Sequence, residues 1–134
     1  MSEQIQSYAI ADLLAMDDGA LNALAAELRG WHYPSPQELK KGAWPGYDKG
    51  DGSYMEAHKW RPATDLNQSR DLLRLAIDKT GNCFNVSTQP DGSFVEIVWV
   101  APGGDTTEIP FNCARGETAA FCAVMLAEIG MLKL

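Results

Sequence analysis

The chain has 134 residues, of which 46% are hydrophobic and 22% charged, a composition typical of one globular domain. This composition excludes collagen-like, disordered and disulfide-scaffold proteins. The net charge of −7 argues against broad contact with a nucleic-acid backbone or an anionic membrane surface. We therefore expect a single domain over residues 1–134, with neither nucleic acid nor a membrane as its partner.

Two helices are predicted at the start of the chain, over Tyr8–Met16 and Ala20–Arg29. The second has an aspartate as a candidate N-cap, apolar residues at three-four spacing, and Gly30 as its end. No periodicity follows over residues 31–62, which contain four of the seven prolines and both histidines. This segment is predicted to be one long, aromatic, Gly/Pro-rich loop inserted between helices.

A central helix is predicted from Thr64 or Asp65 to about Thr80, with Gly81 ending it. Its apolar stripe is expected to consist of Leu66, Leu73, Ala76 and Ile77.

The apolar period then changes to two, which predicts three strands. They cover Phe84–Thr88, Phe94–Val100 and about Glu108–Cys113, joined by turns at 90–92 and 101–107. The last helix, Glu117–Ile129, is apolar almost all round and is expected to be largely buried.

These elements predict an α+β protein: a layered α/β/α sandwich with a three-stranded antiparallel meander, N-terminal helices, a central helix and a C-terminal helix. The expected shared core consists of Leu66, Val95, Ile97, Trp99, Phe121 and Val124.

The order of these elements resembles the phage ABA sandwich domain family over about residues 20–130. The resemblance depends on three segments: Leu28-Arg29-Gly30-Trp31-His32, Trp60-Arg61-Pro62-Ala63-Thr64-Asp65, and the start of the last helix at Glu117-Thr118-Ala119-Ala120-Phe121-Cys122. It implies a small protein of tailed bacteriophages, with helices and a sheet in layers and no established enzymatic activity. It implies no catalytic residues.

The 31–62 segment is also the candidate binding site. It holds three of the four tryptophans and three of the four tyrosines, a density that a mere linker does not need. Five basic against four acidic residues give it a net charge of +1, which leaves −8 for the rest of the chain. The candidate binding residues are Trp31, His32, Trp44, Tyr47, Trp60 and Arg61, together with Arg70 and Arg74 on the adjoining helix.

Each candidate has a purely structural interpretation as well. Trp31 and Trp60 are expected to pack where the segment leaves and rejoins the domain. The arginines are expected to pair with Asp65, Asp71 or Asp78. By contrast, Trp44 and Tyr47 are flanked by proline and glycine, and we expect them to be exposed contact residues.

Catalytic interpretations find little support in the sequence. His32 and His58 with Asp48, Asp51 and Asp65 lack the spacing of a histidine metal motif, and Gly103-Gly104 is not part of a phosphate-binding pattern. Cys122 lies in an apolar helix, where a thiolate would be poorly solvated. We expect no enzymatic activity, no cofactor and no metal.

The three cysteines, Cys83, Cys113 and Cys122, form no C-x-x-C pair, and nothing at the start of the chain resembles a secretion signal. Buried free thiols in a reducing cytoplasm are expected, in preference to a zinc site.

The leading functional hypothesis is a non-enzymatic bacteriophage accessory protein in the cytoplasm of the bacterial host. It would bind a host or phage macromolecule, most simply a protein, through the loop, and interference with a host antiviral system fits this class. The alternative is a small-molecule binder that sequesters an anionic nucleotide through tryptophan and arginine groups. Acidic mimicry of nucleic acid is a third idea, but the acids are too dispersed. The sequence is compatible with both a monomer and a homo-oligomer.

Overall fold

The computed structural model describes residues 8–89, 92–98, 106–110 and 113–133. Its elements in chain order are β1 (Tyr8–Ala9), α1 (Ile10–Ala15), α2 (Asp18–Leu28), α3 (Pro36–Lys40), β2 (Gly46–Asp48), β3 (Tyr54–Glu56), a 3-10 turn η1 (Ala57–Lys59), α4 (Leu66–Thr80), β4 (Cys83–Gln89), β5 (Gly92–Val98), β6 (Thr106–Pro110), α5 (Cys113–Glu128) and β7 (Leu132–Lys133). The predicted α+β class is confirmed, and strands β4, β5 and β6 form the predicted antiparallel meander.

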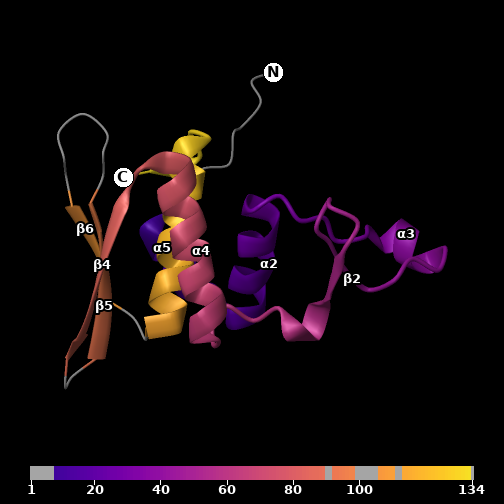
Figure 1. Cartoon of the computed structure of the whole chain (residues 1–134), viewed down its shortest axis with the longest axis horizontal. Helices are drawn as coiled ribbons and strands as arrows, with labels where there is room; N and C mark the ends of the chain where they lie inside the picture. The colour runs from indigo at the N-terminus through magenta and orange to yellow at the C-terminus, as the bar shows by residue number, and fades with distance from the viewer. Residues whose placement is uncertain (1–7, 90–91, 99–105, 111–112, 134) are drawn as a thin grey trace.

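The order of the layers differs from the predicted α/β/α sandwich. Figure 1 shows the β4-β5-β6 sheet at one end, α4 and α5 beside it, α2 beyond them, and a small lobe farthest out. All the described helices therefore lie on one side of the sheet. No described helix covers the outer face of the sheet, on which a polar pair lies: Asn85 Nδ2 donates to Glu96 Oε1 at 3.0 Å.

The core surrounds α5, with β5 of the sheet on one side and buried residues of α1, α2 and α4 on the others. Val95 and Ile97 on β5 and Phe121 and Val124 on α5 are fully buried, as predicted. Helix α5 is buried from residue 116 to residue 126, because it has the sheet on one side and α1, α2 and α4 around it. Trp99, also predicted for this core, lies outside the described residues.

Helix α4 begins and ends where the sequence predicts. The Asp65 side chain accepts a hydrogen bond from the backbone N–H of Gln68, and Gly81 ends the helix at φ +77°, a conformation that favours glycine.

The predicted apolar stripe of α4 is partly wrong. Leu66 and Ile77 are 41% and 43% exposed, so the expectation that Leu66 joins the core fails. The buried positions are Ser69, Leu72, Leu73 and Ala76. Ser69 takes an inward position because its hydroxyl donates to Glu117 Oε2 at 2.8 Å, a partner that the local pattern does not reveal.

Glu117 on α5 is a buried carboxylate between two helices. It accepts hydrogen bonds from Ser69 and, at 3.2 Å, from Nε of Arg70, whose side chain is 59% exposed. Since a buried charge requires partners, this cluster fixes α4 against α5. Arg115 fixes the other side of α5 by an ion pair with Asp18 of α2.

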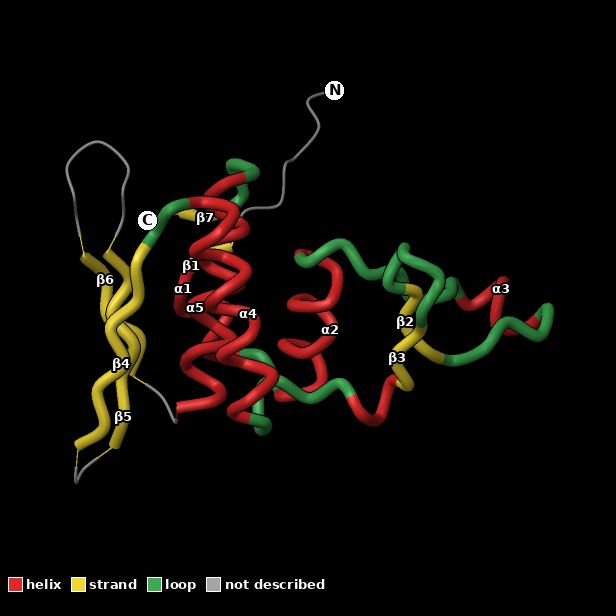
Figure 2. Tube along the Cα trace, in the orientation of Figure 1, coloured by secondary structure: helices red, strands yellow, loops and turns green. Residues whose placement is uncertain are grey.

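Residues 31–59 form the lobe, and here the prediction of one long structureless loop is wrong. The segment contains α3, the antiparallel β2–β3 hairpin and η1, and the backbone of His32 pairs with Asp48. Figure 2 shows these short elements standing apart from the main helical layer, beyond α2.

The first and last described elements also pair. Strand β1 runs parallel to β7, with Tyr8 opposite Leu132. No helix in the described part of the chain is long and apolar enough to cross a membrane.

Candidate functional site

The lobe is built from local turn chemistry. Pro36 occupies the first turn of α3, Ser35 Oγ accepts from the backbone N–H of Glu38, and Glu38 Oε1 accepts from the backbone N–H of Ser35. This reciprocal cap starts a five-residue helix that would not form from propensity alone. In the hairpin, Asp48 and Asp51 each accept a backbone N–H two residues on, which shapes the turn.

Two tryptophans join the lobe to α2. Trp60 is 4% exposed, and its indole Nε1–H donates to the backbone oxygen of Asn22 at 2.8 Å. Its ring lies 4.6 Å from that of half-buried Trp31, and the Arg29 guanidinium stacks 4.0 Å from the Trp31 ring. The interpretation of Trp31 and Trp60 as packing residues at the loop ends therefore agrees with the structure.

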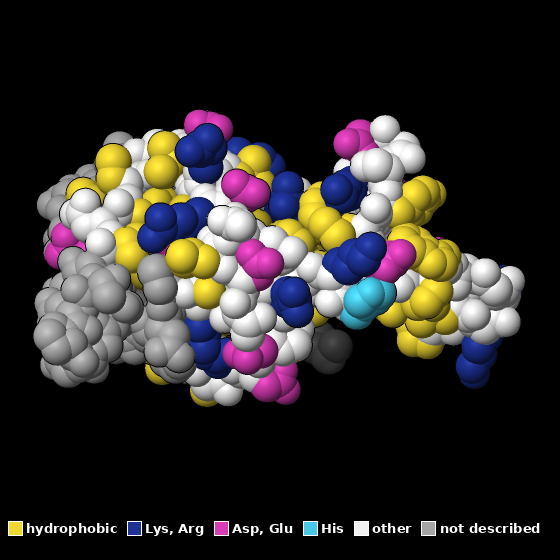
Figure 3. All heavy atoms as spheres, turned by 60° about the horizontal axis from the view of Figure 1, so that its bottom comes forward, with side chains coloured by type: hydrophobic (Ala, Val, Ile, Leu, Met, Phe, Trp, Pro, Cys, Tyr) yellow, Lys and Arg dark blue, Asp and Glu magenta, His cyan; other side chains and the backbone are white. Residues whose placement is uncertain are grey.

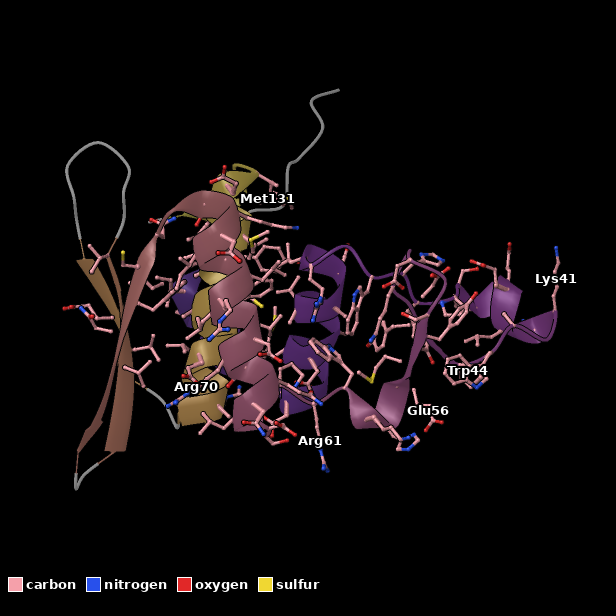
Figure 4. The ribbon with its side chains drawn as sticks, in the orientation of Figure 1. Lys41, Trp44, Glu56, Arg61, Arg70 and Met131 are labelled. Atoms are coloured by element: carbon pink, nitrogen blue, oxygen red, sulfur yellow. The ribbon has the colours of Figure 1, made fainter. Side chains whose placement is uncertain are left out.

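Gln68 of α4 holds the chain where it leaves the lobe. Its side-chain amide donates to the Lys59 backbone oxygen and accepts from the Arg61 backbone N–H, both at 2.7 Å. The Arg61 side chain is exposed at this junction (Figure 4). Together with the Trp60 contacts, these bonds give the lobe a fixed attachment to the helical layers.

The lobe encloses a pocket of about 610 Å³ between α3 and the hairpin. We call this the aromatic pocket; its lining residues are His32, Pro34, Glu38, Ala43, Trp44, Gly46, Asp48 and Tyr54. The Trp44 and Tyr54 rings meet edge to face at 5.8 Å, yet the two residues are 46% and 60% exposed. Figure 3 shows hydrophobic side chains gathered on this end of the molecule, next to charged groups.

The Trp44 ring is held by the backbone of Gly46. A Cβ at position 46 would overlap the ring, with one ring carbon at 2.7 Å and another at 2.8 Å. Because Gly46 has no side chain, the indole lies directly across the strand and buries it. Glycine at position 46 therefore leaves the space that the Trp44 ring occupies in the pocket lining.

Two carboxylates make the pocket wall acidic. The backbone N–H of Ser35, then its hydroxyl, lowers the pKa of Glu38, and nearby His32, with Nε2 3.6 Å from Oε1, lowers it further. Within the described part of the chain, hydrogen bonds reach only Oε1 of Glu38 and only Oδ1 of Asp48. Each group keeps an oxygen with acceptor capacity.

Tyr47 lies on the other face of the hairpin. It is half-buried, with its ring centroid 6.2 Å from that of Trp31 and 5.2 Å from that of Tyr33, so the prediction that Tyr47 is an exposed contact residue is wrong. Burial, and secondarily Tyr33, raises the pKa of the Tyr47 phenol. A second pocket of about 520 Å³ lies here, between the hairpin and α2, and includes Trp31 and Tyr47.

The candidate arginines lie away from the aromatic pocket. Figure 4 shows Arg70 beside α4 on the side of the sheet, with Trp44 far off in the lobe and Arg61 between them. Arg70 and Arg74 line a groove next to Phe84 and Val86 of β4. Arg70 pairs with Glu117, not with the aspartates that the sequence suggested. No shared surface therefore joins Trp44 to Arg70 and Arg74.

Sequence reasoning did not place Glu38, Asp48 or Tyr54 in the binding site, and it considered Asp48 only as a partner of the histidines in a catalytic or metal site. The signal for Glu38 was available, because Ser35-Pro36-Gln37-Glu38 has the spacing of a capping box. Asp48 and Tyr54 come together only through the hairpin register, in which they are directly opposite.

Of the catalytic alternatives, the structure brings His32 and Asp48 into the aromatic pocket beside Glu38, whereas His58 lies beside Glu56. No group of three metal-binding side chains occurs among the described residues. Cys122 is buried, and burial raises the pKa of its thiol, whereas Cys83 is exposed, contrary to the expected burial. The Cys113 side chain lies outside the description.

No family model, curated protein or solved structure matches this chain significantly.

Proposed function

We propose that this chain is a non-enzymatic bacteriophage accessory protein, acting in the cytoplasm of the bacterial host, that binds a protein partner through the aromatic pocket. The bacteriophage assignment follows from the sequence resemblance. The observation that carries the binding role is the Trp44–Tyr54 pair, two large aromatic side chains held at the surface of a pocket. Exposed aromatics of this kind are enriched at interface hot spots. A partner from a host antiviral system fits this proposal.

A small anionic nucleotide is less well supported. Such a ligand would need cations beside the aromatic rings, but the pocket lining contains Glu38 and Asp48 and neither lysine nor arginine. Arg70 lines a separate groove and pairs with Glu117. A protein partner is therefore the better candidate.

The test uses three immobilised forms of the full chain in lysate from infected and uninfected bacteria. They are the unchanged protein, a Trp44→Ala/Tyr54→Ala double variant, and a Leu66→Ala/Ile77→Ala double variant as control. The control also removes two exposed hydrophobic side chains, but from α4. Both variants should melt within a few degrees of the unchanged protein.

We expect a protein that the unchanged chain and the control retain and the Trp44/Tyr54 variant does not. Titration with that protein after purification should show a loss of about 2 kcal/mol or more in binding free energy for the pocket variant. Equal retention by all three forms would contradict the proposal. A rise in melting temperature with nucleoside phosphates would favour the small-ligand alternative.

A further inference from the structure

The aromatic pocket has a chemical character that narrows the class of its occupant. Its lining combines the aromatic rings of Trp44 and Tyr54 with the carboxylates of Glu38 and Asp48 and the imidazole of His32. Aromatic faces and carboxylates share one preference, because both attract cations. The carboxylates favour a cation over an apolar group, and the aromatic rings add a preference for a cation that is planar.

We infer that the aromatic pocket accepts an arginine side chain from the protein partner, with the guanidinium against Trp44 and Tyr54 and its N–H groups donating to Glu38 and Asp48. This inference deepens the proposed function, on which it rests. Arginine suits the pocket better than lysine, because its planar group stacks on rings and presents several donors at once.

Hydrogen-bonding capacity and charge both support this occupant. Oε2 of Glu38 and Oδ2 of Asp48 receive no hydrogen bond within the described part of the chain. Residues 31–62 have a net charge of +1, so the attraction for a cation at the pocket comes locally from the carboxylates of Glu38 and Asp48 in its lining. The hydrogen bonds from Ser35 keep Glu38 charged by lowering its pKa.

The molecule contains an internal example of the same recognition. The guanidinium of Arg29 lies 4.0 Å from the ring of Trp31 and 5.4 Å from that of Trp60. At that position the arginine comes from the chain itself. In the aromatic pocket the ring is exposed, and the corresponding cation has to come from a second molecule.

The probe is the blocked tripeptide acetyl-Gly-Arg-Gly-amide, observed through the tryptophan indole N–H signals in ¹H–¹⁵N spectra at physiological salt. Trp44→Phe assigns the reporting signal, and the Trp60 signal, whose N–H is bonded internally to Asn22, is the reference. We expect saturable movement of the Trp44 signal with a dissociation constant on the order of millimolar, typical of a single side chain. The citrulline peptide, which is neutral and nearly the same shape, should bind at least about fivefold more weakly.

Isosteric variants test the two carboxylates. Glu38→Gln preserves the capping box and Asp48→Asn preserves the turn to Gly50, so each removes a charge with little change in shape. Each should weaken binding of the arginine peptide by about fivefold. Asp51→Asn is the matched control, because Asp51 shapes the same hairpin turn but does not line the pocket.

Several outcomes overturn the inference: an unmoved Trp44 signal, equal binding of arginine and citrulline peptides, or an equal loss from Asp51→Asn. Tighter binding of the lysine peptide contradicts the choice of arginine, and binding of free guanidinium as tight as the peptide contradicts a protein source.

The same experiments distinguish a failure of this inference from a failure of the proposed function. A partner lost with Trp44/Tyr54 but insensitive to Glu38→Gln and Asp48→Asn keeps the proposed function and removes this inference. Binding of the arginine peptide to the pocket, without any protein retained from lysate, keeps the arginine preference and removes the proposed function.

Discussion

The indole N–H of Trp60, at the exit of the lobe, donates a hydrogen bond to the backbone oxygen of Asn22 in α2 at 2.8 Å. The Asn22 side-chain oxygen accepts from the backbone N–H of Ala63, also at 2.8 Å. One residue of a helix thus fixes both the ring and the backbone of the segment that returns from the lobe.

Asn22→Ala should lower the free energy of unfolding by about 1–3 kcal/mol, because the N–H of buried Ala63 loses its acceptor. Asn67→Ala makes the same change at an exposed position of α4 and should cost less than about 0.5 kcal/mol. Denaturant unfolding of both variants measures the difference. Equal costs would show that the Asn22 contacts do not stabilise the domain.

Leu72→Ala and Leu66→Ala are the same substitution on one helix, with opposite expected results. Leu72 is fully buried, so its loss should cost about 2–5 kcal/mol, whereas Leu66 is 41% exposed and should cost less than about 1 kcal/mol. Urea midpoints provide the comparison. A larger effect at Leu66 would restore the apolar stripe that the sequence suggested and would contradict the observed packing.

Arg70→Ala should destabilise the domain by about 1–3 kcal/mol, since it leaves the buried Glu117 carboxylate with fewer donors. Arg74→Ala, one turn along α4, should be nearly neutral. Thermal unfolding at neutral pH distinguishes the two. If Arg70→Ala unfolds normally but abolishes partner binding, Arg70 belongs to the interface after all.

The two described cysteine side chains should differ sharply in reactivity. Cys83 is exposed, whereas Cys122 is buried and burial raises its pKa, which suppresses the reactive thiolate. A thiol reagent at neutral pH should modify Cys83 rapidly and Cys122 only after denaturant is added, as peptide mapping would show. Rapid modification of Cys122 in the native protein would mean that α5 opens readily.

The lowered pKa of Glu38 predicts how α3 responds to acid. The ordinary value is 4.5, and the folded value lies below it, chiefly because the Ser35 backbone N–H bonds the carboxylate. The cap therefore contributes stability fully above about pH 4.5 and loses it as the pH falls through the folded pKa. Carbon-13 titration of the Glu38 carboxyl measures this, and Ser35→Ala should shift its pKa upward. No shift would exclude the Ser35 hydroxyl as a contributor.

Local signals explain which parts of the fold the sequence could predict. The ends of α4 depend on Asp65 and Gly81, which act within one helical turn, and both were predicted correctly. The buried face of α4 depends on Ser69 meeting Glu117, 48 residues away, and no local period encodes such a contact. Two of the four predicted stripe positions, Leu66 and Ile77, are therefore exposed, and Ser69 and Leu72 are buried in addition to Leu73 and Ala76.

The same distinction holds for the candidate site. Trp44 was identified from its flanking proline and glycine, and it is exposed as expected. Asp48 and Tyr54 were missed because β2 and β3 have only three residues each, too few for a visible alternation. Glu38 was missed although its capping-box spacing in α3 was visible. Asp48 reaches the pocket through its backbone pairing with His32, a tertiary contact.

The Trp31 and Trp60 rings, with centroids 4.6 Å apart, bring together the two ends of the lobe through side chains. The backbone leaves at the end of α2 and rejoins the helical layers at the start of α4, so these ends lie apart along the chain path (Figure 2). The ring contact, not the backbone, closes the insertion. Because the entropic cost of closing a segment grows only slowly with its length, a longer or shorter lobe that keeps both rings would change this cost little.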